Sequence, residues 1–298
     1  MNNEQYAMNQ IHITESPRDA QQGLPYIIPA EHRAAYINEL MQAGFDVIDF
    51  GSFVSPKAVP QMADSDKVLD LIDKSGSATK LLAIVGNSRG ASDAATREKT
   101  DIIGFPCSVS NTFLQKNINS DIGKVWRTAQ EIGKICTDKK KEFRVFISMA
   151  FGNPYGDRWN ENIVSDCVKN LVESGVQTIT LSDTIGLATA TSIRSIFEQL
   201  LPLYPQTEIG LHLHTEQKNW REKTDAAWKA GCRSYDGVIN GIGGCPMTGY
   251  ELMGNLNTLN LLSYFAEEQI PHSLNEALIK NIASKYGTFK NLPGLKSL

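Results

Sequence analysis

The 298-residue sequence lacks the features that mark several classes of protein. No apolar run approaches the about 20 residues that a helix needs to cross a bilayer. The N-terminal stretch MNNEQYAMNQ has neither the basic nor the apolar segment of a secretory signal peptide. Five cysteines are scattered without a Cys-x-x-Cys pair, which argues against a disulfide framework and a zinc site. These absences predict a cytoplasmic protein with no membrane partner.

An excess of basic residues is also missing. Lys and Arg number 29 against 33 Asp and Glu, so the formal net charge is −4. Proteins that bind nucleic acid or anionic membranes through electrostatics carry basic patches, so this balance argues against both partners. The apolar fraction of 41% is ordinary and excludes intrinsic disorder. We therefore expect a folded protein that does not bind nucleic acid.

Short β-branched and apolar runs alternate with helical patterns along the chain. The runs span residues 11–16, 45–53, 79–87, 102–110, 143–151, 177–184, 208–215 and 234–241. Helical periodicity fills the intervals, and the segments 30–44, 161–175 and 224–231 each end in glycine, a common helix stop. Eight strands alternating with helices over about 240 residues predict an α/β fold, a single (β/α)8 TIM barrel.

A doubly wound open sheet is the alternative architecture. Its dinucleotide fingerprint, Gly-x-Gly-x-x-Gly after the first strand, is missing, and the GIGG stretch at 241–244 follows the last strand instead. An eighth helical pattern follows residue 254, and residues 274–287 predict one added helix. We therefore predict one domain over residues 1–298, with the barrel at about 11–270 and a C-terminal helical extension at about 271–298.

Residues able to bind a metal or move a proton gather where the predicted strands end. In a (β/α)8 barrel the C-terminal ends of the strands form the active site. The residues at or near those ends are Arg18, Asp19, Asp49, Asp183, His212, His214, Cys245 and Asn255.

His212 and His214 are the most informative pair. Residues two apart on a strand point to the same side, so both imidazoles face one way. With a carboxylate from another strand they would form a divalent-metal site. A pair of hydrogen-bonded core histidines is the alternative, and the pattern alone leaves both open.

Purely structural roles are also possible for the other candidate residues. Arg18 and Asp19 could form an ion pair at a surface turn, and Asp183 could cap the turn that follows it. Free cysteines are often buried packing residues, although the Gly-Gly and Pro neighbours of Cys245 favour a loop.

Several stretches of the sequence resemble 3-hydroxy-3-methylglutaryl-CoA (HMG-CoA) lyase. They are PRDAQQG (17–23), GSFVSPKAVPQMAD (51–64), SDTIG (182–186), HLH (212–214) and GGCP (243–246), in the family's order. The Arg-Asp and His-x-His elements indicate the wider superfamily of metal-dependent barrel lyases and Claisen-type synthases. The SFVSPKAVPQM stretch is specific to the lyases, so the resemblance favours that branch.

The resemblance implies a metal-dependent enzyme that acts on an acyl-CoA thioester. The metal ligands it implies are Asp19, His212, His214 and Asn255, a set that suits Mg²⁺ or Mn²⁺. The catalytic residues it implies are Arg18, which faces the thioester carbonyl, Cys245 as a proton donor, and Asp49, Asp183 and His212. The implied reaction cleaves HMG-CoA to acetyl-CoA and acetoacetate, as in leucine degradation and ketone-body metabolism. A homo-oligomer such as a dimer is implied as well.

The sequence departs from the family around the substrate. The departures are Thr14 and Asp49 in place of glutamates, Thr-Glu-Gln-Lys at 215–218 in place of Asp-Thr-Tyr-Gly, Asn153 in place of a cysteine, and one extra residue between Cys245 and Asn255. The ligand set and Arg18 are unaffected, so the reaction type is better supported than the substrate. A related aldolase or Claisen-type synthase and a non-catalytic metabolite-binding barrel remain as alternatives.

Cys245→Ser tests the proton-donor role. A serine hydroxyl of similar size is a much weaker acid, so turnover should fall by about 100-fold or more while metal binding is unchanged. Alkylating reagents should inactivate the enzyme, and bound substrate should slow that inactivation. Near-normal turnover of Cys245→Ser would eliminate the role, and His212 would become the first alternative acid.

Overall fold

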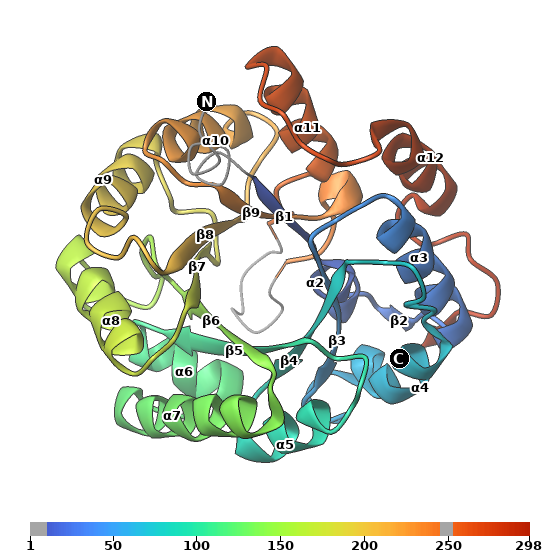
Figure 1. Cartoon of the computed structure of the whole chain (residues 1–298), viewed down its shortest axis with the longest axis horizontal. Helices are drawn as coiled ribbons and strands as arrows, with labels where there is room; N and C mark the ends of the chain where they lie inside the picture. The colour runs from blue at the N-terminus through green and yellow to red at the C-terminus, as the bar shows by residue number, and fades with distance from the viewer. Residues whose placement is uncertain (1–10, 245–252) are drawn as a thin grey trace.

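The computed structural model describes residues 11–244 and 253–298, and its strands form a closed parallel barrel (Figure 1). The barrel strands are β1 (His12–Glu15), β3 (Val47–Phe53), β4 (Lys80–Val85), β5 (Ile102–Ser108), β6 (Glu142–Ser148), β7 (Thr178–Asp183), β8 (Glu208–Leu213) and β9 (Ser234–Gly237). They are adjacent in chain order, and β9 pairs with β1 to close the ring. The TIM-barrel prediction is confirmed.

Helices surround this ring (Figure 1). They are α2 (Pro17–Gln22), α3 (Ala30–Gln42), α4 (Ser65–Leu71), α5 (Ser88–Ala95), α6 (Asn111–Ile118), α7 (Ile122–Lys139), α8 (Glu161–Glu173), α9 (Ala190–Leu200), α10 (Trp220–Lys229), α11 (Thr258–Glu267) and α12 (Glu276–Tyr286), with the 3-10 helices η1 (Pro60–Met62) and η2 (Ile239–Gly241). The added C-terminal helix expected at 274–287 is α12. Within the described ranges, no helix is long and apolar enough to cross a membrane.

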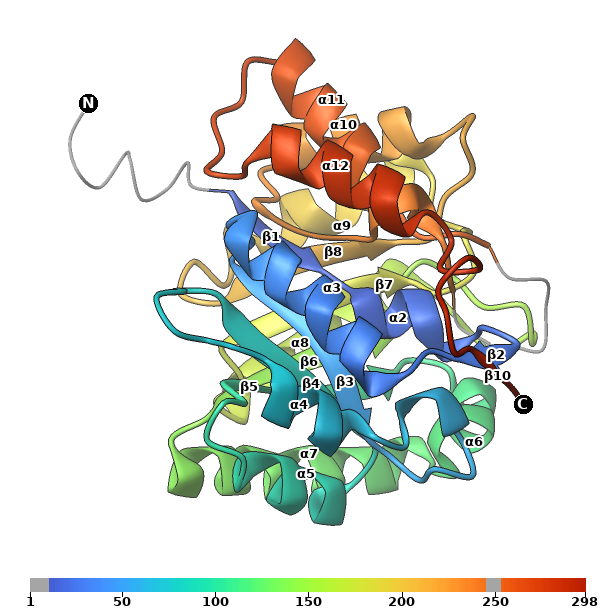
Figure 2. The same cartoon turned by 90° about the vertical axis from the view of Figure 1, so that its right-hand side faces the viewer.

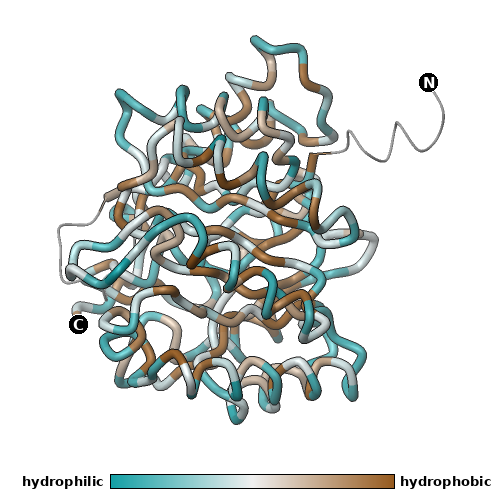
Figure 3. The backbone as a smooth tube through the Cα atoms, turned by 90° about the vertical axis from the view of Figure 1, so that its left-hand side faces the viewer, coloured by the Kyte–Doolittle hydropathy of each residue, from teal (hydrophilic) through white to brown (hydrophobic). Residues whose placement is uncertain are grey.

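Local signals explain where the outer helices begin. The side chains of Asp121 and Asn160 accept hydrogen bonds from main-chain N–H groups in the first turns of α7 and α8. Each of these helices turns an apolar face toward the strands, and the hydrophobic stretches run through the inside of the molecule (Figure 3). The outer layer is therefore held by caps at its ends and apolar burial along its length.

The first strand is shorter than the sequence pattern suggested. It ends at Glu15, and Arg18 and Asp19 lie in the short helix α2 rather than at the end of a strand. Pro17 begins this helix, because its fixed φ and missing N–H suit a first helical position. The helix therefore carries the Arg-Asp pair over the C-terminal end of the barrel.

A small antiparallel sheet joins two segments that local patterns did not predict to pair. It consists of β2 (Tyr26–Ile27), which follows α2, and β10 (Lys296–Ser297) near the end of the chain (Figure 2). The Tyr26 hydroxyl also donates to the carbonyl of Thr288. The C-terminal segment is thereby attached close to the helix that carries Asp19.

One side of the barrel interior is apolar. Its cluster consists of Leu82, Ile84 and Ile102, with Val47 and Phe146 packed against it. A Cβ atom on Gly104 would lie only 2.7 Å from Ile84 Cδ1, so a larger residue would not fit there without movement. Strands β3 to β6 therefore give the interior a close-packed hydrophobic wall.

The other side of the interior is organised by Arg144 on β6, which is almost completely buried. Its guanidinium group donates to Thr180 Oγ1 at 2.8 Å, to Thr14 Oγ1 at 2.8 Å and to Asp236 Oδ1 at 2.7 Å. These partners lie on three other strands, so one side chain connects both sides of the closing β9–β1 pair. A buried ion pair needs such additional hydrogen bonds to offset its loss of hydration.

Glu15 is a fully buried carboxyl group at the end of β1. Its Oε1 atom accepts from the Ile239 main-chain N–H at 2.7 Å, and Oε2 accepts from the Thr258 hydroxyl at 2.6 Å. Burial raises the pKa of Glu15 to about 8, although both hydrogen bonds act to lower it. Glu15 therefore connects β1 to η2 and to the start of α11.

The folding free energy should depend on pH through Glu15. Its pKa is higher in the folded chain, so its contribution to stability is full below about pH 4.5 and is lost as pH rises to about 8. Relative to the non-titrating variant Glu15→Gln, the wild type should lose up to about 1.4 kcal/mol per pH unit in that window. Urea unfolding from pH 5 to 9 measures this difference, with the exposed variant Glu98→Gln as the control. A pH-independent difference between wild type and Glu15→Gln would contradict the prediction.

Candidate active site

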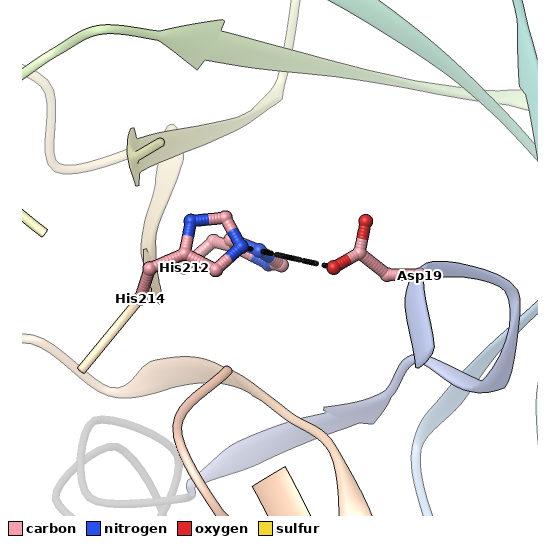
Figure 4. A group of neighbouring side chains, drawn as sticks. All are labelled: Asp19, His212 and His214. Carbon is pink, nitrogen blue, oxygen red and sulfur yellow. Dashed lines mark ion pairs between the residues drawn. The ribbon is translucent and has the colours of Figure 1, made fainter. Parts of the chain in front are cut away.

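A carboxylate and two imidazoles meet above the barrel interior. The Nε2 atoms of His212 and His214 lie 4.0 and 3.8 Å from Asp19 Oδ2. Figure 4 shows the two rings, from the end of β8, facing the carboxylate that α2 supplies. All three residues are buried, and their ligand atoms lie within 4.8 Å of one another, a group that can hold a divalent metal ion.

The second nitrogen of each ring fixes its orientation. Nδ1 of His212 lies 3.2 Å from Asp236 Oδ2, and Nδ1 of His214 lies 2.9 Å from the Asp183 carbonyl oxygen. Metal-binding histidines commonly have this kind of partner on the nitrogen that does not bind the metal. The sequence left open whether His212 and His214 bind a metal or are hydrogen-bonded core histidines. The structure is compatible with both, since each ring is hydrogen-bonded through Nδ1 and still directs Nε2 at Asp19.

Asn255 completes the group. It forms an isolated antiparallel bridge with His214, and its Nδ2 lies 2.8 Å from Asp19 Oδ2. Among the described residues, its Oδ1 and the Nε2 of His214 are buried without a hydrogen-bond partner. Buried polar atoms rarely stay unpaired, so an unpaired amide oxygen and an unpaired ring nitrogen beside a carboxylate fit a bound cation.

The main chain holds Asn255 in place from both sides. The carbonyl of Gly254 accepts from the Thr215 N–H at 2.9 Å, and the Leu256 N–H donates to the Leu213 carbonyl at 2.9 Å. A Cβ atom on Gly254 would lie 2.4 Å from the Gly241 carbonyl oxygen, so only glycine allows this approach. The segments before and after residues 245–252 thus touch directly next to the site.

Arg18 lies between two carboxylates. Its Nε and Nη2 atoms donate to Asp49 Oδ2 at 3.0 and 2.6 Å, and its Nη1 donates to Asp19 Oδ1 at 3.0 Å. Gln22, one turn further along α2, also donates to Asp19 Oδ1 at 2.6 Å. Asp19 is therefore oriented by two donors on its own helix, which leaves Oδ2 directed toward the histidines.

A β-bulge brings Asp49 into the site. The pairing of β3 with β4 shifts register between Asp49 and Gly51, and Phe50 packs into the outer core. Asp49 and Ser52 consequently both line the cavity, although strict alternation would put residues three apart on opposite faces.

Burial and neighbouring charges set the protonation of the site. Burial raises the pKa of Asp49 to about 6, even though Arg18 acts to lower it. Burial also opposes ionisation of Asp19, but Arg18 and the two histidines outweigh it and hold its pKa well below the usual range. For His212, burial lowers the pKa, whereas the Asp236 hydrogen bond and the charges of Asp236 and Asp19 give a net increase. The three side chains therefore differ in the pH at which they change charge.

A cavity of about 470 Å³ opens above these residues, within the roughly 300–1,000 Å³ typical of small-molecule sites. Its polar end holds Arg18, Asp19, Asp49 and both histidines, and its apolar walls include Ile84, Pro106 and Phe146. Toward the rim it passes Asn87, Lys116 and Asn119. The cavity can therefore take a ligand with a polar reacting end and an extended remainder.

Comparison with known proteins shows the family to which the chain belongs. The model of the family described as HMGL-like matches residues 10–285. The chain belongs to the HMGL-like family. This family membership makes it a carbon–carbon lyase and confirms the resemblance to HMG-CoA lyases.

The similar proteins are named as acyl-CoA lyases, but their names give different substrates. A hydroxymethylglutaryl-CoA lyase from Bacillus subtilis is 30% identical over 230 residues, which are 77% of this chain and 76% of that protein. An (R)-citramalyl-CoA lyase from Chloroflexus aurantiacus is 28% identical over 275 residues, 88% of this chain and 85% of that protein. The structure of an HMG-CoA lyase from Acinetobacter baumannii in complex with coenzyme A and 3-methylmalate has a TM-score of 0.86 at 26% identity, with 96% of this chain and 97% of that chain covered.

In this HMGL-like chain, most of the candidates from the sequence come together. The cavity and its floor unite Arg18, Asp19, Asp49, His212, His214 and Asn255. Cys245 lies outside the described residues, so the proton-donor role remains a prediction. Thr14, where the resemblance led us to expect a glutamate, lies below the site, and its hydroxyl accepts a hydrogen bond from Arg144.

Asp183 is placed differently from the other candidates. Its Oδ2 atom lies 3.0 Å from Lys223 Nζ on α10, and its Oδ1 atom accepts from the Ala188 N–H at 3.0 Å. Ser182 and Thr184 line the cavity, so the Asp183 side chain between them faces the helices. The contact with the Ala188 N–H is of the kind that the capping alternative describes, and the carbonyl oxygen of Asp183 contacts His214, so its catalytic role stays a prediction.

Three supporting residues were missed in the sequence. Gln22 and Asp19 are three apart on α2 and therefore share a face, a spacing that could have identified Gln22. Arg144 places a charge in the mostly apolar strand β6, a possible signal of a buried pair, but only the closed barrel shows that it meets Asp236 on β9.

Removing either histidine should abolish metal binding. His212→Ala and His214→Ala each delete an Nε2 that faces Asp19, so Mn²⁺ affinity should fall by more than the roughly 10–100-fold typical of outer-shell changes. His12→Ala, at the opposite end of the barrel, is the matched control and should bind Mn²⁺ like the wild type. Titration calorimetry on folded proteins measures this, and full Mn²⁺ affinity in either site variant would remove that residue from the ligand set.

Proposed function

We propose that the protein cleaves HMG-CoA to acetyl-CoA and acetoacetate with one Mg²⁺ or Mn²⁺ ion. The observation that carries this proposal is the group formed by Asp19, His212, His214 and Asn255 next to Arg18 at one end of the cavity. One carboxylate, two imidazoles and an amide oxygen form a donor set that would suit such an ion. The HMG-CoA lyases among the relatives support this substrate.

The reaction begins with removal of the proton from the substrate's tertiary hydroxyl. Asp19, His212, His214 and Asn255 would hold a divalent cation, and such a cation would supply Lewis-acid polarisation that lowers the pKa of a hydroxyl group. Asp49 is the proposed base, because its pKa is about 6 and its Oδ1 has no hydrogen-bond partner among the described residues. A base with a pKa near the working pH is ionised at neutral pH and still takes a proton readily.

Breaking the C2–C3 bond moves an electron pair onto the thioester. C3 becomes the ketone carbon of acetoacetate, and the acetyl-CoA half becomes an enolate whose oxygen carries the negative charge. The Arg18 guanidinium, fixed by Asp49 and Asp19, stabilises that oxygen. The thiol of Cys245 then donates a proton to C2, which completes acetyl-CoA and leaves a thiolate to be reprotonated by solvent.

The acyl group of the substrate is less well defined than the type of reaction. The Acinetobacter baumannii lyase binds coenzyme A and 3-methylmalate, which supports a thioester and a branched hydroxy acid as ligands here. A citramalyl-CoA is the second candidate, because the citramalyl-CoA lyase covers 88% of this chain. Cleavage of that thioester releases pyruvate in place of acetoacetate.

An assay with both thioesters tests the proposal. Purified protein with Mg²⁺ should release acetyl-CoA from HMG-CoA, EDTA should abolish the release, and added Mg²⁺ or Mn²⁺ should restore it. The second product, acetoacetate or pyruvate, identifies the preferred substrate, and a 4-hydroxy-2-oxoacid serves to test the aldolase alternative. Protein that binds Mn²⁺ but cleaves none of these compounds would refute a lyase and favour a metabolite-binding barrel.

A further inference from the structure

Lys223 is a lysine buried in the layer between α10 and the barrel, with only 1% of its surface exposed. Its Nζ atom lies 3.0 Å from Asp183 Oδ2 and 3.1 Å from the Gly186 carbonyl oxygen. Neither side chain of this ion pair is more than 2% exposed. Burying two charges costs hydration free energy, so an ion pair in such a place is weak evidence for stabilisation and invites a search for another role.

The ion pair is directly connected to one of the proposed metal ligands. Lys223 and the Ala188 N–H occupy the two carboxylate oxygens of Asp183. The carbonyl oxygen of the same residue lies 2.9 Å from Nδ1 of His214 and 3.3 Å from the Gly186 amide nitrogen. The contacts therefore run from Lys223 through Asp183 to the imidazole ring.

We propose that Lys223 is a positioning residue for His214. By holding the Asp183 carboxylate and the Gly186 carbonyl, it fixes the turn after β7 so that the Asp183 carbonyl accepts the Nδ1–H proton. An imidazole that carries its proton on Nδ1 has its lone pair on Nε2, and this nitrogen faces Asp19 at 3.8 Å. Lys223 thereby selects the tautomer that can bind a cation.

The same turn contacts the segment that leads to Asn255. A Cβ atom on Gly186 would lie 2.0 Å from Met253 Sδ and 3.4 Å from the His214 carbonyl oxygen, so the turn packs tightly against both. Without Lys223, the buried Asp183 carboxylate would keep only the Ala188 N–H as a partner among the described residues. Such a carboxylate would draw in water or rotate, and the turn would move with it.

Lys223→Met tests the inference because it keeps an unbranched apolar chain and removes the charge. Long-range ¹H–¹⁵N NMR on the metal-free protein reports the tautomer of His214. The wild type should show the single Nδ1–H form, whereas Lys223→Met should show a mixture of both forms. Mn²⁺ affinity should fall by about 10–100-fold, as is typical when an outer-shell partner of a ligand is lost.

Lys99→Met is the matched control for the loss of a lysine with internal partners. The amine of Lys99 donates to the main-chain carbonyls of Leu69, Asp70 and Ile72, away from the cavity. This variant should keep the single His214 tautomer and the wild-type Mn²⁺ affinity, whatever its effect on unfolding. A change in tautomer or affinity in both lysine variants would assign the effect to general loosening and overturn the inference.

The two readouts separate this inference from the proposed function on which its metal-binding part rests. A wild type that binds no Mn²⁺ would remove the metal site, while the metal-free NMR spectrum would still test Lys223. A folded Lys223→Met protein with the single Nδ1–H tautomer and unchanged Mn²⁺ affinity would overturn the inference alone. If that variant does not fold, the milder Lys223→Gln takes its place, with the same two changes expected and the same unchanged result decisive against it.

Discussion

Three buried carboxylates lie together with two arginine side chains in and just above the barrel. Asp19, Asp49 and Asp236 supply three negative charges, and Arg18 and Arg144 supply two positive ones. Every carboxylate contacts at least one arginine, yet one negative charge remains uncompensated when the histidines are neutral. Burial of an unpaired charge is unfavourable, so this excess makes the space between Asp19 and the imidazoles attractive to a cation.

The shape of the site follows from a few local rules that act on different strands. Alternation along β8 puts both imidazoles on the inner face, and the bulge in β3 brings Asp49 to the cavity. Arg144 lies underneath and holds Asp236, which in turn contacts the His212 ring. The hydrogen bonds beneath the cavity therefore include strands that close the barrel. A substitution on β6 or β9 that moves Arg144 or Asp236 would also move the His212 ring.

Local sequence patterns predicted those features of the protein that follow a regular spacing along the chain. The eight strands came from β-branched runs between helical segments, and the histidine pair came from a spacing of two residues. Patterns of this kind assume that a strand alternates without interruption. The register shift at Phe50 breaks that assumption and could not be predicted from the sequence FDVIDFGSF, although Asp49 itself was among the candidates.

Other features depend on partners far away in the sequence. The pairing of β2 with β10 joins opposite ends of the chain, and the ion pair between Arg144 and Asp236 exists only once the barrel closes. The sequence placed Asp183 at the end of its strand, where β7 has it, but made no prediction about the direction of its side chain. The Asp183 carboxylate points toward Lys223 on α10, and no local motif connects these two residues in the sequence.

The close approach of Gly254 to Gly241 has a consequence for how such a protein can change during evolution. These two glycines meet at the base of the segment 245–252, and the main chain beyond them holds Asn255 against His214. A loop whose ends are pinned can gain or lose a residue without displacing what lies outside the pinned ends. The resemblance to the family puts one extra residue between Cys245 and Asn255, and we expect it to be such an insertion. Relatives can therefore differ in the number of residues between Gly244 and Met253 while the contact between Asn255 and His214 stays the same.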